Sequence, residues 1–186
     1  APNTIVMFGT GKLLAANDKF TTTTESFYGI WDHGDQNIQR NKLLEQTYQT
    51  TGNTRTLTDN TINYQADNPN QSDQGWYIDF VDGERIITNP ATRGGFIFFN
   101  TTIPTTDSPC SFGGSGWLMV AKVENGGQPS EAVFDVNNDD QLDDNDKIND
   151  NFVSGLLYEA GVPAESSFLA DQMYTATSSG EIDKRK

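Results

Sequence analysis

Short runs of β-branched and aromatic residues, each closed by turn residues, recur along the chain and restrict it to an all-β fold. Nine strands are expected: Ile5–Phe8, Phe27–Trp31, Arg55–Thr58, Trp76–Phe80, Arg85–Thr88, Phe96–Thr102, Trp117–Val123, Ala132–Phe134 and Met173–Thr177. Helix is limited to a turn or two at Asn41–Tyr48 and near Ala164–Asp171. The polar stretch from Thr50 to Gln74 is expected to be a loop with room for a short hairpin.

A weak internal repeat relates three of these segments, Tyr28–Asp35, Trp76–Glu84 and Trp117–Gly127. Each contains an aromatic residue, an alternating apolar strand, a polar turn and glycine, and the leading aromatic residues lie 48 and 41 residues apart. A period of about 40–50 residues is typical of β-propeller blades. Any antiparallel sheet also produces strand–turn–strand units, but the period favours blades over a sandwich. The chain would supply about three or four blades, so a closed ring needs more chain.

The strand that begins at Trp117 is expected to be core. Trp117, Met119 and Ala121 would share one face, with Leu118 and Val120 on the other. Both faces are apolar, as expected for a strand whose sheet is covered on both sides.

Six aspartates and three asparagines lie within the twelve residues 135–146. Most charge runs are solvated acidic loops. Here, however, side-chain oxygens fall at positions one, three, five, nine and twelve, and position seven can offer a main-chain carbonyl. This is the order in which a calcium loop surrounds its ion with oxygen. The predicted ligands are Asp135, Asn137, Asp139, Gln141, Asp143 and Asp146.

The loop departs from an EF-hand in three ways. Position six, normally glycine, is Asp140, which tolerates the left-handed backbone better than most residues. Position twelve is Asp146, one methylene shorter than the usual glutamate, so Asp143 is an alternative closing ligand with Asp146 in support. The preceding residues are strand-like. We therefore expect a calcium clip in a β protein, with Leu142 as the inward apolar residue.

Composition excludes several functions. The formal charge is −14 with no basic cluster, so nucleic acid is not an expected partner, and no apolar run is long enough to span a membrane. The abrupt start close to a strand indicates a piece of a larger protein. Cys110, the single cysteine, has no neighbouring His or Lys to activate it; it is either unpaired or bonded to a partner outside this sequence.

No catalytic site is predicted. The single histidine, His33, excludes a multi-histidine metal site, and a Gly-x-Ser-x-Gly elbow is absent from the sequence. Asp79, Asp82 and Glu84 could imitate a pair of catalytic carboxylates, but turn chemistry explains them more simply.

Four segments resemble a known family in their order along the chain: Val6–Asp32, Gly75–Pro90, Phe96–Val120 and Phe134–Asp146. The most specific part is "GERIITNP" followed by "PCSFGGSGWL". Together they resemble the C-terminal β-propeller of the type IV pilus-associated PilY/PilC family. The resemblance implies that residues 1–186 form part of a modified, quinoprotein-like propeller that has lost quinone chemistry and is not an enzyme.

The same resemblance implies a calcium-binding protein at the bacterial surface, at the pilus tip or outer membrane, reached through the periplasm. Such proteins support pilus biogenesis, oppose retraction and contribute to adhesion and twitching motility. Minor pilins or other pilus-tip proteins, and host or abiotic surfaces, would be the partners. The calcium pattern of the family falls on Asp135, Asn137, Asp139 and Asp143, with the Gln141 carbonyl between them.

Two alternatives stay open. A quinoprotein-type enzyme would need cationic and stacking residues around a cofactor and a tryptophan motif in every blade, which three tryptophans do not supply. A dockerin-like, calcium-dependent protein-binding module shares the Asp-Asn-Asp order, but would carry two such loops flanked by helices.

Overall fold

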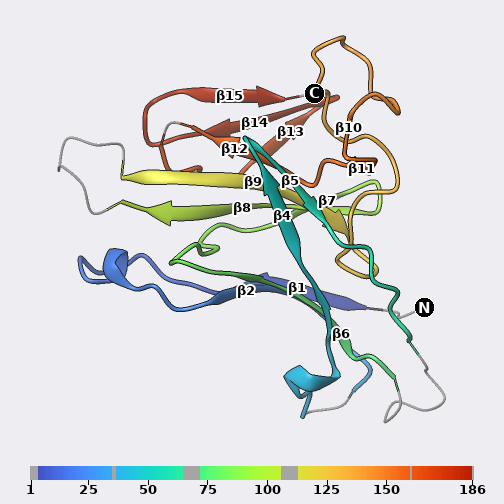
Figure 1. The fold of residues 1–186 in the computed structure, drawn as a ribbon. Helices are drawn as coiled ribbons and strands as arrows, with labels where there is room; N and C mark the ends of the chain where they lie inside the picture. The colour runs from blue at the N-terminus through green and yellow to red at the C-terminus, as the bar shows by residue number, and fades with distance from the viewer. Residues whose placement is uncertain (1–3, 35–36, 65–71, 106–112, 160, 186) are drawn as a thin grey trace.

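The computed structural model describes residues 4–34, 37–64, 72–105, 113–159 and 161–185, and these residues form an all-β fold with two short 3-10 turns. Cys110 lies outside the described residues, so its state stays a prediction. The strands are arranged in stacked sheets (Figure 1).

The first sheet has four strands in the order β1-β2-β6-β3. Strand β3 runs parallel to β6, and the other pairs are antiparallel. The strands are β1 (Ile5–Gly9), β2 (Glu25–Trp31), β6 (Gly75–Phe80) and β3 (Leu44–Gln46).

The second sheet has six strands in the order β4-β5-β12-β9-β8-β7, all antiparallel. They are β4 (Tyr48–Thr51), β5 (Thr54–Leu57), β12 (Gly155–Tyr158), β9 (Gly114–Lys122), β8 (Phe96–Pro104) and β7 (Ala91–Arg93). Strand β12 lies between partners that come much earlier in the chain: Leu156 is in register with Thr54 on one side and with Leu118 on the other.

The third sheet, β13-β14-β15, covers the outer side of the second sheet (Figure 1). Its strands are β13 (Ser167–Leu169), β14 (Gln172–Ala176) and β15 (Ile182–Arg185). A small hairpin of β10 (Lys147–Ile148) and β11 (Asn151–Phe152) follows the acidic loop.

Two apolar cores hold the stack together. The first lies between the four- and six-stranded sheets and includes Phe27, Trp76 and Phe99. The second lies between the six-stranded sheet and the C-terminal residues and includes Phe98, Phe134 and Met173. Apolar area removed from water is the main favourable contribution to such packing.

Strand β9 contributes to both cores. Trp117, Met119 and Ala121 belong to the first, whereas Leu118 and Val120 belong to the second. The predicted alternation along this strand is therefore confirmed.

Two predicted strands are wrong. Residues 85–88 form no strand, and Arg85 makes just an isolated bridge to Thr102, because Glu84 and Arg85 direct their side chains into separate buried polar networks. Residues 132–134 form no strand either; Phe134 is buried by the second core without a ladder partner.

Both helix predictions are wrong. Residues 41–48 contain the end of a 3-10 turn, Arg40–Lys42, and then enter β3 and β4, since pairing with β6 and β5 outweighs local preference. Residues 164–171 contain β13. A hairpin of β4 and β5 lies at the start of the predicted loop 50–74, and its first strand begins before that range, at Tyr48.

The repeat does not mark one blade per copy. Its first two copies place β2 and β6 side by side in one sheet, whereas β9 lies in the next.

Candidate metal centre

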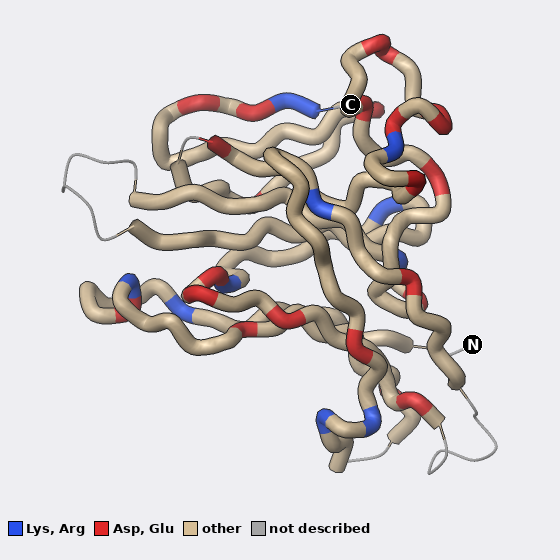
Figure 2. The backbone as a smooth tube through the Cα atoms, in the orientation of Figure 1, with Lys and Arg blue, Asp and Glu red and all other residues tan. Residues whose placement is uncertain are grey.

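The acidic loop, residues 135–146, leaves the second core at Phe134 and ends where β10 begins. Figure 2 shows its acidic residues on the part of the chain that projects beside the C-terminal sheet. Asp139 and Asp140 are exposed, whereas Asp135 and Asp143 are half-buried.

The backbone of the loop turns around its own carboxylates. The amides of Asp139 and Asp140 donate to the Asp135 carboxylate at 3.2 and 2.9 Å, and the amide of Gln141 donates to Asp139 at 2.9 Å. Asp140 has a φ of 64°, so position six adopts the left-handed conformation for which EF-hands use glycine. The Asp140 substitution is thus compatible with the turn that a calcium loop needs.

Asp146 closes the loop through backbone amides. Its side chain is 1% exposed, and its Oδ1 accepts the amides of Val136 at 2.8 Å and Asn137 at 3.4 Å. Its Oδ2 accepts the amide of Asp143 at 3.0 Å. The last residue of the loop therefore fastens the first turn to the final turn.

The donor set is chemically suited to a hard cation. Each carboxylate oxygen has two lone pairs, so Asp135 can accept a backbone amide and still coordinate an ion. In the part of the chain that the structure describes, however, no three His, Cys, Asp or Glu side chains converge into a metal-binding group. The carboxylates would have to approach one another to share an ion.

Asp144 lies outside this set. Its side chain is 85% exposed and pairs with Lys147 at 2.6 Å. It therefore offers a control for removal of charge without loss of a predicted ligand.

The expected inward position of Leu142 is wrong. The side chain is 43% exposed and lies at the edge of an apolar cavity. Phe134 is already buried in the second core and Val136 packs against it, so Leu142 remains outside.

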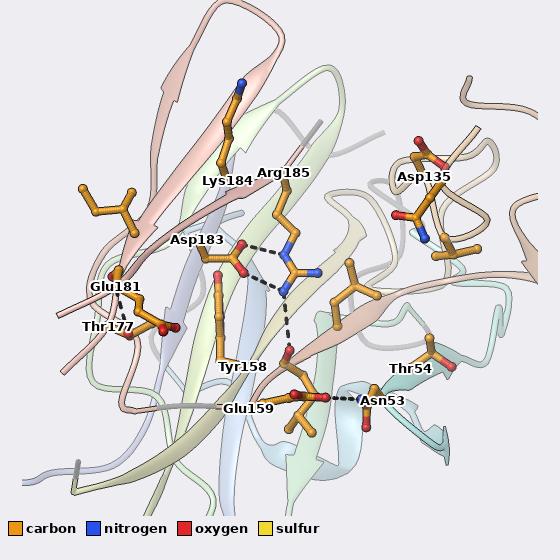
Figure 3. A pocket seen from close by; sticks show the side chains of 15 residues that line it. Asn53, Thr54, Asp135, Tyr158, Glu159, Thr177, Glu181, Asp183, Lys184 and Arg185 are labelled. Carbon is orange, nitrogen blue, oxygen red and sulfur yellow. Dashed lines mark hydrogen bonds and ion pairs between the residues drawn. The ribbon is translucent and has the colours of Figure 1, made fainter. Parts of the chain in front are cut away.

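A polar groove of about 900 Å³ separates the start of the loop from β15. Figure 3 shows Asp135 on one side and Asp183 and Arg185 on the other. Arg185 pairs with Asp183 at 2.6 and 2.8 Å, and Glu159 accepts a hydrogen bond from Asn53 at 2.5 Å. Most of the charged groups that face this groove therefore already form ion pairs or hydrogen bonds within the chain.

Burial of the neighbouring Tyr158 raises its pKa to about 12, so its hydroxyl stays neutral. It donates to Thr175 at 2.9 Å.

Sequence reasoning missed two buried arginines. Arg55 forms a two-point ion pair with Glu84 at 2.6 and 2.8 Å, and Thr101 donates to the same carboxylate at 2.5 Å. Glu84 is therefore a core ion-pair residue, and turn chemistry does not explain it. Asp79 likewise pairs with Arg40, whereas Asp82, at a φ of 57°, is a turn residue as predicted.

Arg85 holds the early loop in place. Its guanidinium is buried and donates to four backbone carbonyls, those of Lys12, Asp18, Thr21 and Gly83. The sequence signal for this network is the adjacent charged pair Glu84 and Arg85 beside apolar residues. Burying charged side chains is costly unless they are paired or hydrogen-bonded, so such a pair indicates a buried polar network.

The comparisons with known proteins agree with the resemblance. No family model matches the chain. A type IV pilus biogenesis factor PilY1 homolog of Xylella fastidiosa is 37% identical over 135 residues, covering 66% of this chain and 9% of that protein. The type IV pilus biogenesis factor PilY1 of Pseudomonas aeruginosa is 30% identical over 156 residues, covering 71% of this chain and 13% of that protein. The chain belongs to the PilY1 family.

A second PilY1 homolog of Xylella fastidiosa aligns over 97% of the chain at 27% identity, and covers 15% of that protein. The chain thus spans between about a tenth and a seventh of the length of these PilY1 relatives. The crystal structure of the Pseudomonas aeruginosa PilY1 C-terminal domain matches 98% of this chain with a TM-score of 0.75 and 23% identity, and 42% of that domain is covered. The predicted fold class, all-β and part of a modified propeller, is confirmed.

Among the described residues, no helix is long and apolar enough to cross a membrane.

Proposed function

We propose that this chain is a calcium-binding propeller segment of a pilus-tip-associated protein that supports type IV pilus biogenesis. Membership in the PilY1 family supports the pilus role, and the conformation of the acidic loop supports the assignment of calcium binding. The single observation that carries the calcium assignment is the left-handed Asp140 at the position of the EF-hand glycine, within a loop closed by Asp146.

The structure favours one of the two closing ligands. Because the Asp146 carboxylate is buried and accepts three backbone amides, Asp143 is the better candidate to complete the shell. Asp135, Asn137, Asp139 and the Gln141 carbonyl would supply the other oxygens. Asp146 then serves as the support that keeps the turns together.

Bound calcium would neutralise the mutual repulsion of these carboxylates and fix the segment between Phe134 and β10. No helix pair flanks the loop within the described residues, so the expected response is local ordering, without the groove opening of sensor EF-hands.

Titration calorimetry with CaCl₂ tests the site in the full chain. We expect Asp139→Ala to lower the affinity for calcium by a factor of about ten or more, equivalent to about 1.4 kcal/mol. Asp144→Ala removes the same charge and should leave affinity within about twofold, since an exposed pair contributes little. Equal losses in both variants would reduce the run to a diffuse acidic patch.

At the level of the cell, the proposal extends to opposition to pilus retraction and to adhesion and twitching on host or abiotic surfaces, with minor pilins as contacts and a location at the pilus tip or outer membrane. Asp139→Ala in the complete protein should alter piliation or twitching, whereas Asp144→Ala should not. Normal piliation in an Asp139→Ala strain that has lost calcium binding would separate the ion from the pilus role.

The alternatives make different predictions. A quinoprotein enzyme would bind quinone after reconstitution and show its absorption spectrum. A dockerin-like module would carry two such loops flanked by helices and give a far-UV spectrum dominated by helix, whereas the described residues are built from strands.

A further inference from the structure

An apolar cavity of about 480 Å³ opens between the acidic loop and the three-stranded sheet. Its volume falls in the range of about 300–1,000 Å³ that is usual for ligand pockets. The apolar lining comes from four separate parts of the chain: Phe96 and Phe98 of β8, Phe134 and Leu142, Phe168 of β13, and Met173 of β14.

The floor of the cavity is rigid and its edge is exposed. Phe96, Phe98 and Met173 are at most 8% exposed and belong to the second core, so they are held by packing. Phe168 packs edge-on against Phe98, with ring centroids 5.0 Å apart. Leu142, at the edge, is 43% exposed. A preformed apolar depression with an exposed apolar edge is the form that receives an anchoring side chain at a protein interface.

The charges around the cavity favour a cationic occupant. Arg93 is paired with Asp171 at 3.2 Å and Arg185 with Asp183, so both basic groups at the edge are neutralised. Glu131 is exposed and forms no ion pair among the described residues. The adjoining loop carries six aspartates, and Lys147 pairs with Asp144. One bound calcium ion would neutralise two further charges, so the loop would stay negative.

We propose that this cavity docks one large apolar side chain of a partner protein, presented between lysine or arginine residues. The apolar side chain would contact Phe98, Phe168 and Met173, and the flanking charges would face Glu131 and the acidic loop. The proposal rests on the cavity and its charges, and it does not require calcium to be bound.

The test uses the full chain with ¹³C-methyl-labelled methionine and leucine, and end-blocked pentapeptides as probes. The first peptide has phenylalanine between two lysines; the others have serine between lysines, or phenylalanine between glutamates. We expect the first to shift the Met173 and Leu142 methyl signals saturably, and the other two to bind at least fivefold more weakly. Equal binding of the two phenylalanine peptides would overturn the charge assignment, and no shift from either would overturn the site.

Two pairs of variants locate the contact. Ala132→Trp should fill the cavity and abolish binding, whereas Ala16→Trp, on an exposed loop elsewhere, should not. If Ala132→Trp does not fold, Glu131→Lys still tests the proposal. We expect this variant to bind the phenylalanine–lysine peptide about two- to fivefold more weakly, and the difference to shrink in high salt. Glu45→Lys on the four-stranded sheet is its control. An equal effect of Glu45→Lys would mean non-specific attraction to an acidic chain.

Two other occupants would be recognised in the same measurements. Free toluene that shifts the methyl signals as strongly as the phenylalanine–lysine peptide would make this a small-molecule cavity. Methyl shifts that depend on protein concentration without any probe would indicate a second copy of the chain. Either result would overturn the proposal of a cationic partner segment.

Discussion

Asp146 shows how a single carboxylate can organise an acidic loop. Its carboxylate is shielded from water, and its two oxygens accept hydrogen bonds from three backbone amides. The carboxylates of Asp135 and Asp139 also accept backbone amides, within shorter turns of the loop. The loop can therefore retain its shape while several negative charges remain available to a cation.

Replacing Asp146 with alanine should destabilise the chain by about 2–4 kcal/mol, because buried amides left without an acceptor each cost about 1–3 kcal/mol. Asp146→Asn keeps one acceptor oxygen and should lose less. Urea unfolding curves measured without calcium provide the values. A loss below about 0.5 kcal/mol for Asp146→Ala, the range of ordinary surface substitutions, would contradict this role.

Asp18 makes the stability of the early loop depend on pH. Hydrogen bonds from the amides of Ala15 and Leu14, followed by the nearby Lys12, lower its pKa from 3.8 to about 2. Since the folded pKa lies below the unfolded value, the contribution is complete above about pH 4 and is lost as the pH falls towards 2.

Asp18→Asn cannot titrate, so the variant should be less stable at pH 7 and approach the unmodified chain between about pH 4 and pH 2. Melting temperatures across this range measure the difference. A gap between the two proteins that stays constant from pH 7 to pH 2 would show that the Asp18 charge does not stabilise the folded state.

At the scale of elements, β9 is the strand on which both cores depend. Trp117 is 4% exposed, packs in the first core and lies under the Arg55 guanidinium at 4.0 Å. Trp117→Ala should cost about 3–5 kcal/mol. Phe20→Ala, at a side chain that is 60% exposed, is the matched control and should cost little. Unchanged melting of Trp117→Ala would place this side chain outside the core.

The strands that were predicted correctly are those whose apolar pattern is itself the cause of their burial, such as β2, β6, β8 and β9. Short strands such as β13 were missed because their pairing with β14 is tertiary and their own composition is weak. The strand prediction for residues 85–88 is wrong for the opposite reason. Their composition is strand-like, but hydrogen bonds of the buried charged side chains determine the path of the backbone.

The acidic loop was recognisable because its oxygen spacing is local. Its left-handed Asp140 could also be anticipated, since position six demands that conformation. The burial of Asp146 and the exposure of Leu142 could not be predicted from the sequence, because both depend on the second core and the sheet that covers it.

At the scale of the whole molecule, one buried ion pair connects the sheets. Arg55 of β5 lies between the rings of Tyr48 and Trp117, at 4.2 and 4.0 Å, and bonds Glu84 on the segment that leaves β6. The hydroxyl of Thr101 on β8 donates a further hydrogen bond to the Glu84 carboxylate. A pair with these contacts fixes how the four-stranded sheet meets the six-stranded one.

Glu84→Gln should cost about 3–5 kcal/mol, because it leaves the Arg55 charge buried without a counter-ion. The double variant Arg55→Met with Glu84→Gln should lose less than the sum of the single changes. A double-mutant cycle from urea unfolding measures this coupling. Additive losses would mean that the two side chains contribute independently.

The position of β12 between β5 and β9 sets an order of events during synthesis. The chain emerges from the ribosome N-terminus first, so the β4–β5 hairpin and the β8–β9 hairpin are both complete before the strand that joins them exists. About a hundred residues separate Thr54 from its partner Leu156, and closing so long a loop is entropically costly and slow. Until that strand arrives, β9 has an unpaired edge open to pairing with another chain. A nascent chain arrested before residue 155 should therefore be the form most in need of a chaperone.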